Sequence, residues 1–259
     1  EIDSGSLWRG GCLSGPDSHV TIVPYFTVPD DKMDLFKSGF EKFYSGTKAG
    51  TEECLYYGFA VRGNQVFCRE GYKSAAGALA HIGDVKESLE ESLAIVGEGL
   101  DLSVMGPAAE LEKLKDALMP LGAKFWEIDS GSLWRGGCLS GPDSHVTIVP
   151  YFTVPDDKMD LFKSGFEKFY SGTKAGTEEC LYYGFAVRGN QVFCREGYKS
   201  AAGALAHIGD VKESLEESLA IVGEGLDLSV MGPAAELEKL KDALMPLGAK
   251  FWEIDSGSL

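Results

Sequence analysis

Along residues 19–61, runs of apolar residues with the spacing of a strand alternate with runs that have the spacing of a helix. The run His19–Val28 is rich in β-branched and aromatic residues, which predicts a strand. Pro24 lies inside it, and because proline donates no backbone hydrogen bond, we expect an edge position or a bulge there. After Pro29 and two acidic residues, large apolar side chains recur at helical spacing and predict a first helix. These side chains, which we expect to be core, are Met33, Phe36, Phe40 and Phe43.

The next two runs predict a β-hairpin. Cys54–Val61 and Gln65–Tyr72 flank the turn dipeptide Gly63-Asn64. Counting outward from the turn pairs positions that share one face of the sheet: Val61 with Val66, Phe59 with Cys68, Tyr57 with Glu70, and Leu55 with Tyr72. The opposite face carries the small residues Gly58, Ala60 and Gly71, and we expect helices to pack closely there.

The remaining pattern completes an α+β order. Ser74 is a good N-cap for a helix running through Ala75 to Ile82, which Gly83-Asp84 should kink or restart before the segment Val85–Val96. A strand at Leu100–Val104 follows, then a helix opened by Gly106-Pro107 and a last strand at Ala123–Asp129. The order is β-α-β-β-α-β followed by α-β. Its first six elements are those of a ferredoxin-like domain.

The whole pattern occurs twice without a substitution. Residues 1–126 are repeated as 127–252, and residues 253–259 repeat the first seven. We therefore expect two small domains, at 19–129 and 145–255, with 130–144 as a linker in which Trp134 docks on a domain. Residues 1–18 are then the tail of a preceding repeat with its linker, and 256–259 start the next linker. Such a chain is expected to be a segment of a longer tandem array, although an engineered fusion would show the same identity.

Composition narrows the function classes. With 44% hydrophobic and 25% charged residues the chain is typical of globular domains, and no apolar run reaches membrane-spanning length. The net charge of -16 disfavours nucleic-acid binding, which relies on clustered basic residues. Each copy has three cysteines, Cys12, Cys54 and Cys68, without CxxC spacing. We expect no metal site, and the disulfide state stays open.

One segment of each copy carries a family resemblance. The segment Phe67–His81 resembles the strand-to-helix signature of antibiotic-biosynthesis-monooxygenase and quinol-monooxygenase-like domains. Glu70, Tyr72, Ala78 and His81 fill the places of the strand glutamate, the aromatic, the small helix-start residue and the helical histidine. Gly106–Leu111 is similar to a second strand-to-helix junction of such domains.

The resemblance implies that two ferredoxin-like sheets pair into a dimeric α+β barrel, each half with a small apolar pocket. The two copies are thus expected to pair with each other. Further copies of the repeat and a small aromatic ligand are the other expected partners. Activities in this family include cofactor-independent oxygenation of phenols or quinols and haem degradation. The chain has neither an Asn in its first strand nor a Trp one turn beyond His81, so haem binding is not expected. No other cofactor is expected either.

The same residues suggest a site on their own chemistry. A carboxylate opposite a tyrosine, with a histidine in the next helix, could take a proton from a phenol and stabilise the anion. The expected catalytic residues are Tyr57, Glu70, Tyr72 and His81 with their copies Tyr183, Glu196, Tyr198 and His207. The expected apolar walls for substrate are Phe26, Phe59 and Trp126 with their copies Phe152, Phe185 and Trp252.

Two functions remain open from the sequence. The first is a small-molecule-binding barrel acting as a cofactor-independent monooxygenase on a phenolic or quinol-like compound. The second is a non-catalytic structural repeat of a longer array or filament, in which Glu70 and His81 only complete local hydrogen bonding. Exact repetition favours the second function, because catalysis gains nothing obvious from identical copies in series.

Overall fold

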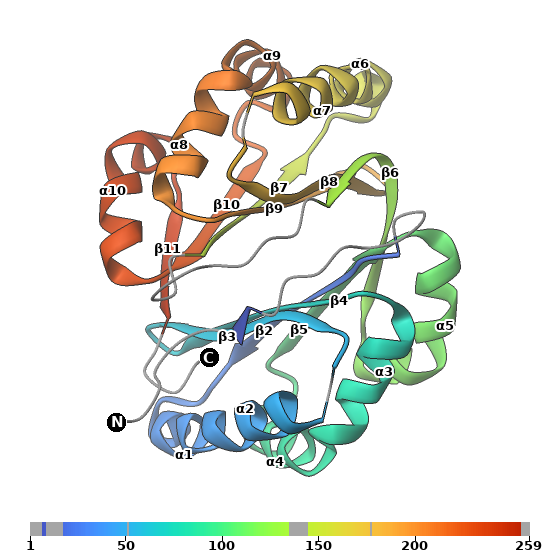
Figure 1. Cartoon of the computed structure of the whole chain (residues 1–259), viewed down its shortest axis with the longest axis vertical. Coiled ribbons are helices and arrows are strands. Elements are labelled where there is room, and N and C mark those ends of the chain that lie inside the picture. The colour runs from blue at the N-terminus through green and yellow to red at the C-terminus, as the bar shows by residue number, and fades with distance from the viewer. Residues whose placement is uncertain (1–6, 9–17, 51, 135–144, 177, 255–259) are drawn as a thin grey trace. The chain divides into compact units, whose positions relative to one another are not determined.

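The computed structural model describes residues 7–8, 18–50, 52–134, 145–176 and 178–254, and these form two compact units (Figure 1). One unit comprises the described residues up to Phe125 together with Trp252–Ile254, and the other comprises the described residues from Trp126 to Phe251. Each unit therefore combines the body of one copy with the end of the last strand of the other. The Trp134 side chain, Cys12 and Cys138 lie outside what the structure describes, so the expectations about them stay predictions.

Both copies contain the same elements. In the first copy and its flanks the strands are β1 (Leu7–Trp8), β2 (Val20–Thr27), β3 (Cys54–Arg62), β4 (Gln65–Tyr72), β5 (Leu100–Gly106) and β6 (Lys124–Trp134). The helices are α1 (Met33–Ser38), α2 (Phe40–Ala49), α3 (Ala75–Asp84), α4 (Lys86–Val96) and α5 (Ala108–Leu118). The second copy has β7 (Val146–Thr153), β8 (Cys180–Arg188), β9 (Gln191–Tyr198), β10 (Leu226–Gly232), β11 (Lys250–Ile254), α6 (Met159–Ser164), α7 (Phe166–Ala175), α8 (Ala201–Asp210), α9 (Lys212–Val222) and α10 (Ala234–Leu244).

The core of each unit is an antiparallel sheet. In the first unit β2 lies between β5 and β4, and β3 pairs with β4. The outer side of β3 pairs with Glu253–Ile254 of β11 and with β1. The second unit repeats this order with β10, β7, β9 and β8, and β8 pairs with Glu127–Trp134 of β6. The predicted ferredoxin-like α+β fold is confirmed.

The hairpin has the predicted register near its turn but not at its far end. Tyr57 faces Glu70 and Phe59 faces Cys68, as expected. A register shift between Cys54 and Tyr56 then puts Cys54, not Leu55, opposite Tyr72. The pairing predicted for Leu55 is therefore wrong, because an irregularity of one residue moves every later position.

Two further expectations about the sheet are wrong. Pro24 is not on an edge strand, since β2 has partners on both sides; pairing with β4 runs to Ile22 and resumes at Tyr25 with unchanged register. The helices also do not cover the face with the small residues. They pack on the other face, where the rings of Phe40 and Phe59 stack with centroids 4.3 Å apart.

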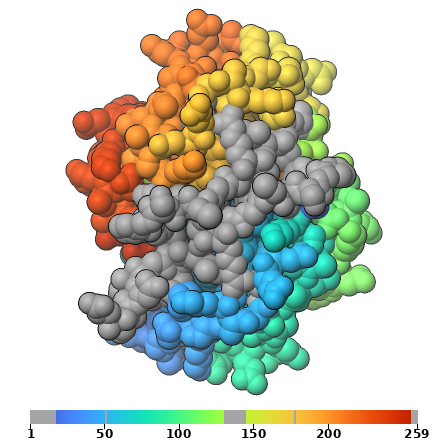
Figure 2. All heavy atoms as spheres, viewed as in Figure 1, coloured from blue at the N-terminus to red at the C-terminus, as the bar shows by residue number. Residues whose placement is uncertain are grey.

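The helices bury the three phenylalanines that their spacing predicts, whereas Met33 is only partly buried. The first predicted helix is divided at Gly39 into α1 and α2, which bury three phenylalanines against the sheet: Phe36, Phe40 and Phe43. Ser74 caps α3 by accepting a hydrogen bond from the Gly77 backbone N–H at 3.3 Å. In Figure 2 the corresponding helices of the second copy, α6 and α7 in yellow, form part of the surface.

The last strand of each copy ends in the other unit. Trp252 packs against Tyr25 and Phe67 of the first unit, with ring centroids 5.5 and 5.8 Å away. Its copy Trp126 makes the same contacts in the second unit. β6 continues to Trp134, into the segment expected to be a linker. Among the described residues, none of the helices is long and apolar enough to cross a membrane.

Candidate active site

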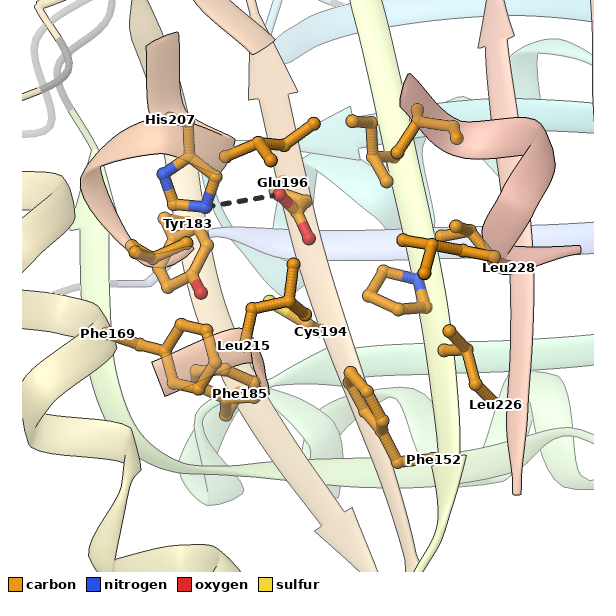
Figure 3. A pocket seen from close by; sticks show the side chains of 16 residues that line it. Phe152, Phe169, Tyr183, Phe185, Cys194, Glu196, His207, Leu215, Leu226 and Leu228 are labelled. Carbon is orange, nitrogen blue, oxygen red and sulfur yellow. Dashed lines mark ion pairs between the residues drawn. The ribbon is translucent and has the colours of Figure 1, made fainter. Parts of the chain in front are cut away.

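Each unit holds a cavity between its sheet and its helices. In the first unit most of its lining consists of apolar side chains from β2, β3, β5 and the helices α2, α3, α4 and α5. About 60 Å³ of free space lies inside, and the equivalent cavity of the second unit has the same size (Figure 3). Mostly apolar walls with few polar groups are typical of small-molecule sites, although the volume of about 60 Å³ lies below the roughly 300–1,000 Å³ of most ligand pockets.

The polar groups of the cavity gather on β3, β4 and α3. The Nε2 atom of His81 lies 3.6 Å from Oε2 of Glu70, and the hydroxyl of Tyr72 donates a hydrogen bond to that same carboxylate oxygen. The ring of Tyr57 lies beside His81, with centroids 5.1 Å apart. In the second unit His207 and Glu196 make the same contact, which Figure 3 marks with a dashed line.

Burial changes the protonation of both central residues. Only 8% of Glu70 and 4% of His81 is exposed. Burial raises the pKa of the Glu70 carboxyl to about 7, and the hydrogen bond from Tyr72 opposes part of this increase. Burial lowers the pKa of His81 to about 4, an effect partly opposed by the Asp84 carboxylate. The same directions hold for Glu196 and His207.

These pKa values define what the pair can do near neutral pH. His81 is neutral there, so its contact with Glu70 is not an ion pair even though the distance would allow one. Glu70 is divided between its acid and its carboxylate forms. A carboxyl group that changes protonation near the operating pH is suited to accept and return a proton.

Most of the predicted site residues come together. Tyr57, Glu70, His81, Phe26 and Phe59 line the first cavity, and their copies line the second. Tyr72 stands behind Glu70 as its hydrogen-bond partner. Trp126 and Trp252, expected as apolar walls, are not among the lining residues and pack on the opposite face of the sheet.

Sequence reasoning missed two polar neighbours of the site. Cys68 lines the cavity as a free thiol, and burial raises its pKa well above the usual value. Thr47 on α2 lies with Oγ1 3.4 Å from Nδ1 of His81. The available signal was a threonine four residues after Phe43, on the apolar stripe of the predicted helix.

Other polar clusters lie apart from the cavity. His19 has its Nε2 atom 3.1 Å from the hydroxyl of Tyr56, whose position on β3 points to the other face of the sheet. Among the described residues, no group of three or more His, Cys, Asp or Glu side chains is arranged to hold a metal ion.

The chain is similar in structure to several solved proteins. No protein-family model matches the chain, and no curated protein matches it. A candidate monooxygenase from Fusobacterium nucleatum is 13% identical with a TM-score of 0.57, over 83% of this chain and 91% of that one. A candidate monooxygenase from Lactobacillus acidophilus is 13% identical with a TM-score of 0.52, over 82% and 91%. MupZ from Pseudomonas fluorescens is 30% identical over 48% of this chain and 96% of its own, with a TM-score of 0.39.

The two likenesses with TM-scores above 0.5 extend over both units of the chain. The resemblance seen at Phe67–His81 is thus confirmed at the level of the fold. The chain has the ferredoxin-like α+β fold that these two structures share.

Proposed function

We propose that each unit is a cofactor-independent monooxygenase site for a phenolic or quinol-like compound. One observation carries this proposal: a buried carboxyl, Glu70, that is half-ionised near pH 7 lies beside neutral His81 at the wall of an apolar cavity. The apolar walls suit an aromatic body. Glu70 and His81, at the polar end of the cavity, can form hydrogen bonds with its hydroxyl group.

The reaction follows from proton transfer to Glu70. The ionised carboxylate takes the hydroxyl proton of the substrate, and the resulting phenolate is electron-rich enough to react with O₂ at a ring carbon. A C–O bond forms, the peroxide takes a proton back from Glu70, and the hydroperoxide loses water to leave a carbonyl group. For a naphthol the balance is one naphthol and one O₂ giving one quinone and one water.

Isotope labelling tests this reaction. Purified protein is incubated with naphthols and dihydroxynaphthalenes under ¹⁸O₂ without added cofactor. We expect O₂ uptake equal to product formed, with one labelled oxygen in the quinone and the other in water. No O₂ uptake above that of the heat-unfolded protein with any of these compounds, or an oxygen in the product that comes from solvent, would contradict the proposal.

The histidine gives a second test. Replacing His81 and His207 together by alanine is expected to abolish turnover while leaving the fold intact, because it removes the imidazole 3.6 Å from the carboxyl group and keeps the apolar walls of the cavity. Circular dichroism and urea unfolding check the fold, and O₂ uptake checks turnover. Equal turnover in this variant would remove His81 from the mechanism, whereas loss of folding would favour a structural role.

The alternative, a structural repeat without catalysis, is favoured by one observation, the exact identity of the two copies. It predicts that no compound of the panel binds. Equilibrium dialysis with the same naphthols separates the two functions, because a binding site should retain naphthol at micromolar to millimolar concentration even when turnover is slow.

A further inference from the structure

The threonine beside His81 is fully buried. Thr47 lies on α2 and is 0% exposed. Its hydroxyl is 2.7 Å from the carbonyl oxygen of Phe43 and 3.4 Å from Nδ1 of His81. Thr173 of the second copy has the same two distances, to Phe169 and His207. The arrangement is therefore built twice.

The two contacts determine which way the hydrogen bonds run. A hydroxyl has one proton to donate and two lone pairs that accept. The carbonyl of Phe43 can only accept, so the proton of Thr47 goes to it, as threonines in helices commonly do with the residue four positions earlier. The Oγ1 atom is then left as an acceptor, which suits a neutral His81 ring that carries its proton on Nδ1.

The other ring nitrogen faces the cavity. Nε2 of His81 lies 3.6 Å from Glu70, and Figure 3 shows the equivalent nitrogen of His207 directed to Glu196. A neutral imidazole protonated at Nδ1 has a lone pair at Nε2. Nε2 can therefore accept a hydrogen bond from a hydroxyl group in the cavity.

We infer that Thr47 and Thr173 are positioning residues that hold His81 and His207 in the Nδ1–H tautomer. In this form Nε2 accepts a hydrogen bond from a hydroxyl group of a neutral ligand and holds that group beside the Glu70 carboxyl. The consequence for the ligand rests on the proposed function, whereas the tautomer is a property of the protein alone.

Removing the threonine hydroxyl should reverse the tautomer. In a Thr47→Val, Thr173→Val variant the side-chain shape is kept, and Phe43 still receives the backbone hydrogen bond of the helix. A proton on Nδ1 would then be buried without an acceptor, whereas a proton on Nε2 could be donated to Glu70. Because an unsatisfied buried donor is costly, the ratio of tautomers should change by about tenfold or more toward Nε2–H.

Long-range ¹H–¹⁵N spectra of the ¹⁵N-labelled full chain at pH 7.5 test this inference without any substrate. The chain has four histidines. The signals of His81 and His207 are those missing in a His81→Asn, His207→Asn variant. We expect Nδ1 to be protonated in the unmodified protein, and protonation at Nε2 there would overturn the inference.

The variants add an internal control. The valine pair should show Nε2–H, and the Thr47→Ser, Thr173→Ser pair, which restores the hydroxyl, should show Nδ1–H. A folded valine variant that keeps Nδ1–H would also overturn the inference. If the valine variant does not fold, the spectrum of the unmodified protein decides alone. Absence of turnover would affect the proposed function but not this result.

Discussion

Replacing Glu70 and Glu196 together by glutamine is expected to lower kcat for a phenolic substrate by about 10²- to 10⁴-fold at pH 8. Glutamine has the shape of the carboxylate and still accepts the hydrogen bond from Tyr72, but it takes up no proton. The change therefore removes the proton acceptor and keeps the cavity. O₂ uptake measured at saturating naphthol gives kcat directly.

Matched variants make the result specific. Glu112→Gln with Glu238→Gln removes the same charge from exposed side chains and should leave kcat unchanged. Because the two cavities are alike, changing Glu70 alone or Glu196 alone should leave about half of kcat with an unchanged KM. Turnover of the double glutamine variant within threefold of the unmodified protein would remove Glu70 as the base.

The pH profile distinguishes a base from a structural carboxyl. Burial raises the pKa of Glu70 to about 7, so the carboxylate form grows as the pH rises through that value. We expect kcat/KM of the unmodified protein to increase from pH 5.5 to pH 8 with a midpoint near 7. A profile that is flat over this range, or that falls as the pH rises, would contradict the assignment.

The sequence predicted those features of the fold that depend on local periodicity. The hairpin register near its turn followed from two-residue alternation around Gly63-Asn64. Gly63 has φ of +62°, which glycine adopts readily because it has no Cβ. The N-cap at Ser74 followed from residue type alone. Tyr57, Glu70 and His81 could be placed together for the same reason, since they lie on paired strands and the helix that follows.

Features that depend on distant parts of the chain were not predictable in this way. The small residues of the hairpin suggested close helix packing, but Gly71 serves another purpose: a Cβ there would lie 2.2 Å from Cζ of Tyr56, whose ring crosses it. Trp126 was placed in the wrong surroundings because its strand ends in the other unit, which no local pattern reveals. Thr47 became visible only when its distance to His81 was known.

The protonation of the buried pair also has consequences for stability, and the two residues act in opposite directions. Glu70 has its pKa raised from 4.5 to about 7, so its contribution to folding is fully present below pH 4.5 and is lost as the pH rises through 7. His81 has its pKa lowered from 6.5 to about 4, so its contribution is present above pH 6.5 and is lost as the pH falls through 4. Each amounts to about 3 kcal/mol per copy, at about 1.4 kcal/mol for each pH unit. In the intact pair the two contributions oppose each other.

Breaking the pair should make each dependence visible. We expect the free energy of unfolding of the unmodified protein, minus that of Glu70→Gln with Glu196→Gln, to decrease by about 3 kcal/mol per copy between pH 4.5 and pH 7. With His81→Gln and His207→Gln the corresponding difference should instead increase by about 3 kcal/mol per copy between pH 4 and pH 6.5. Urea unfolding at several pH values measures both, and the subtraction removes the other carboxylates, which are common to both proteins. Differences that do not change with pH, or that change in the same direction for both variants, would show that Glu70 and His81 are not held neutral by burial.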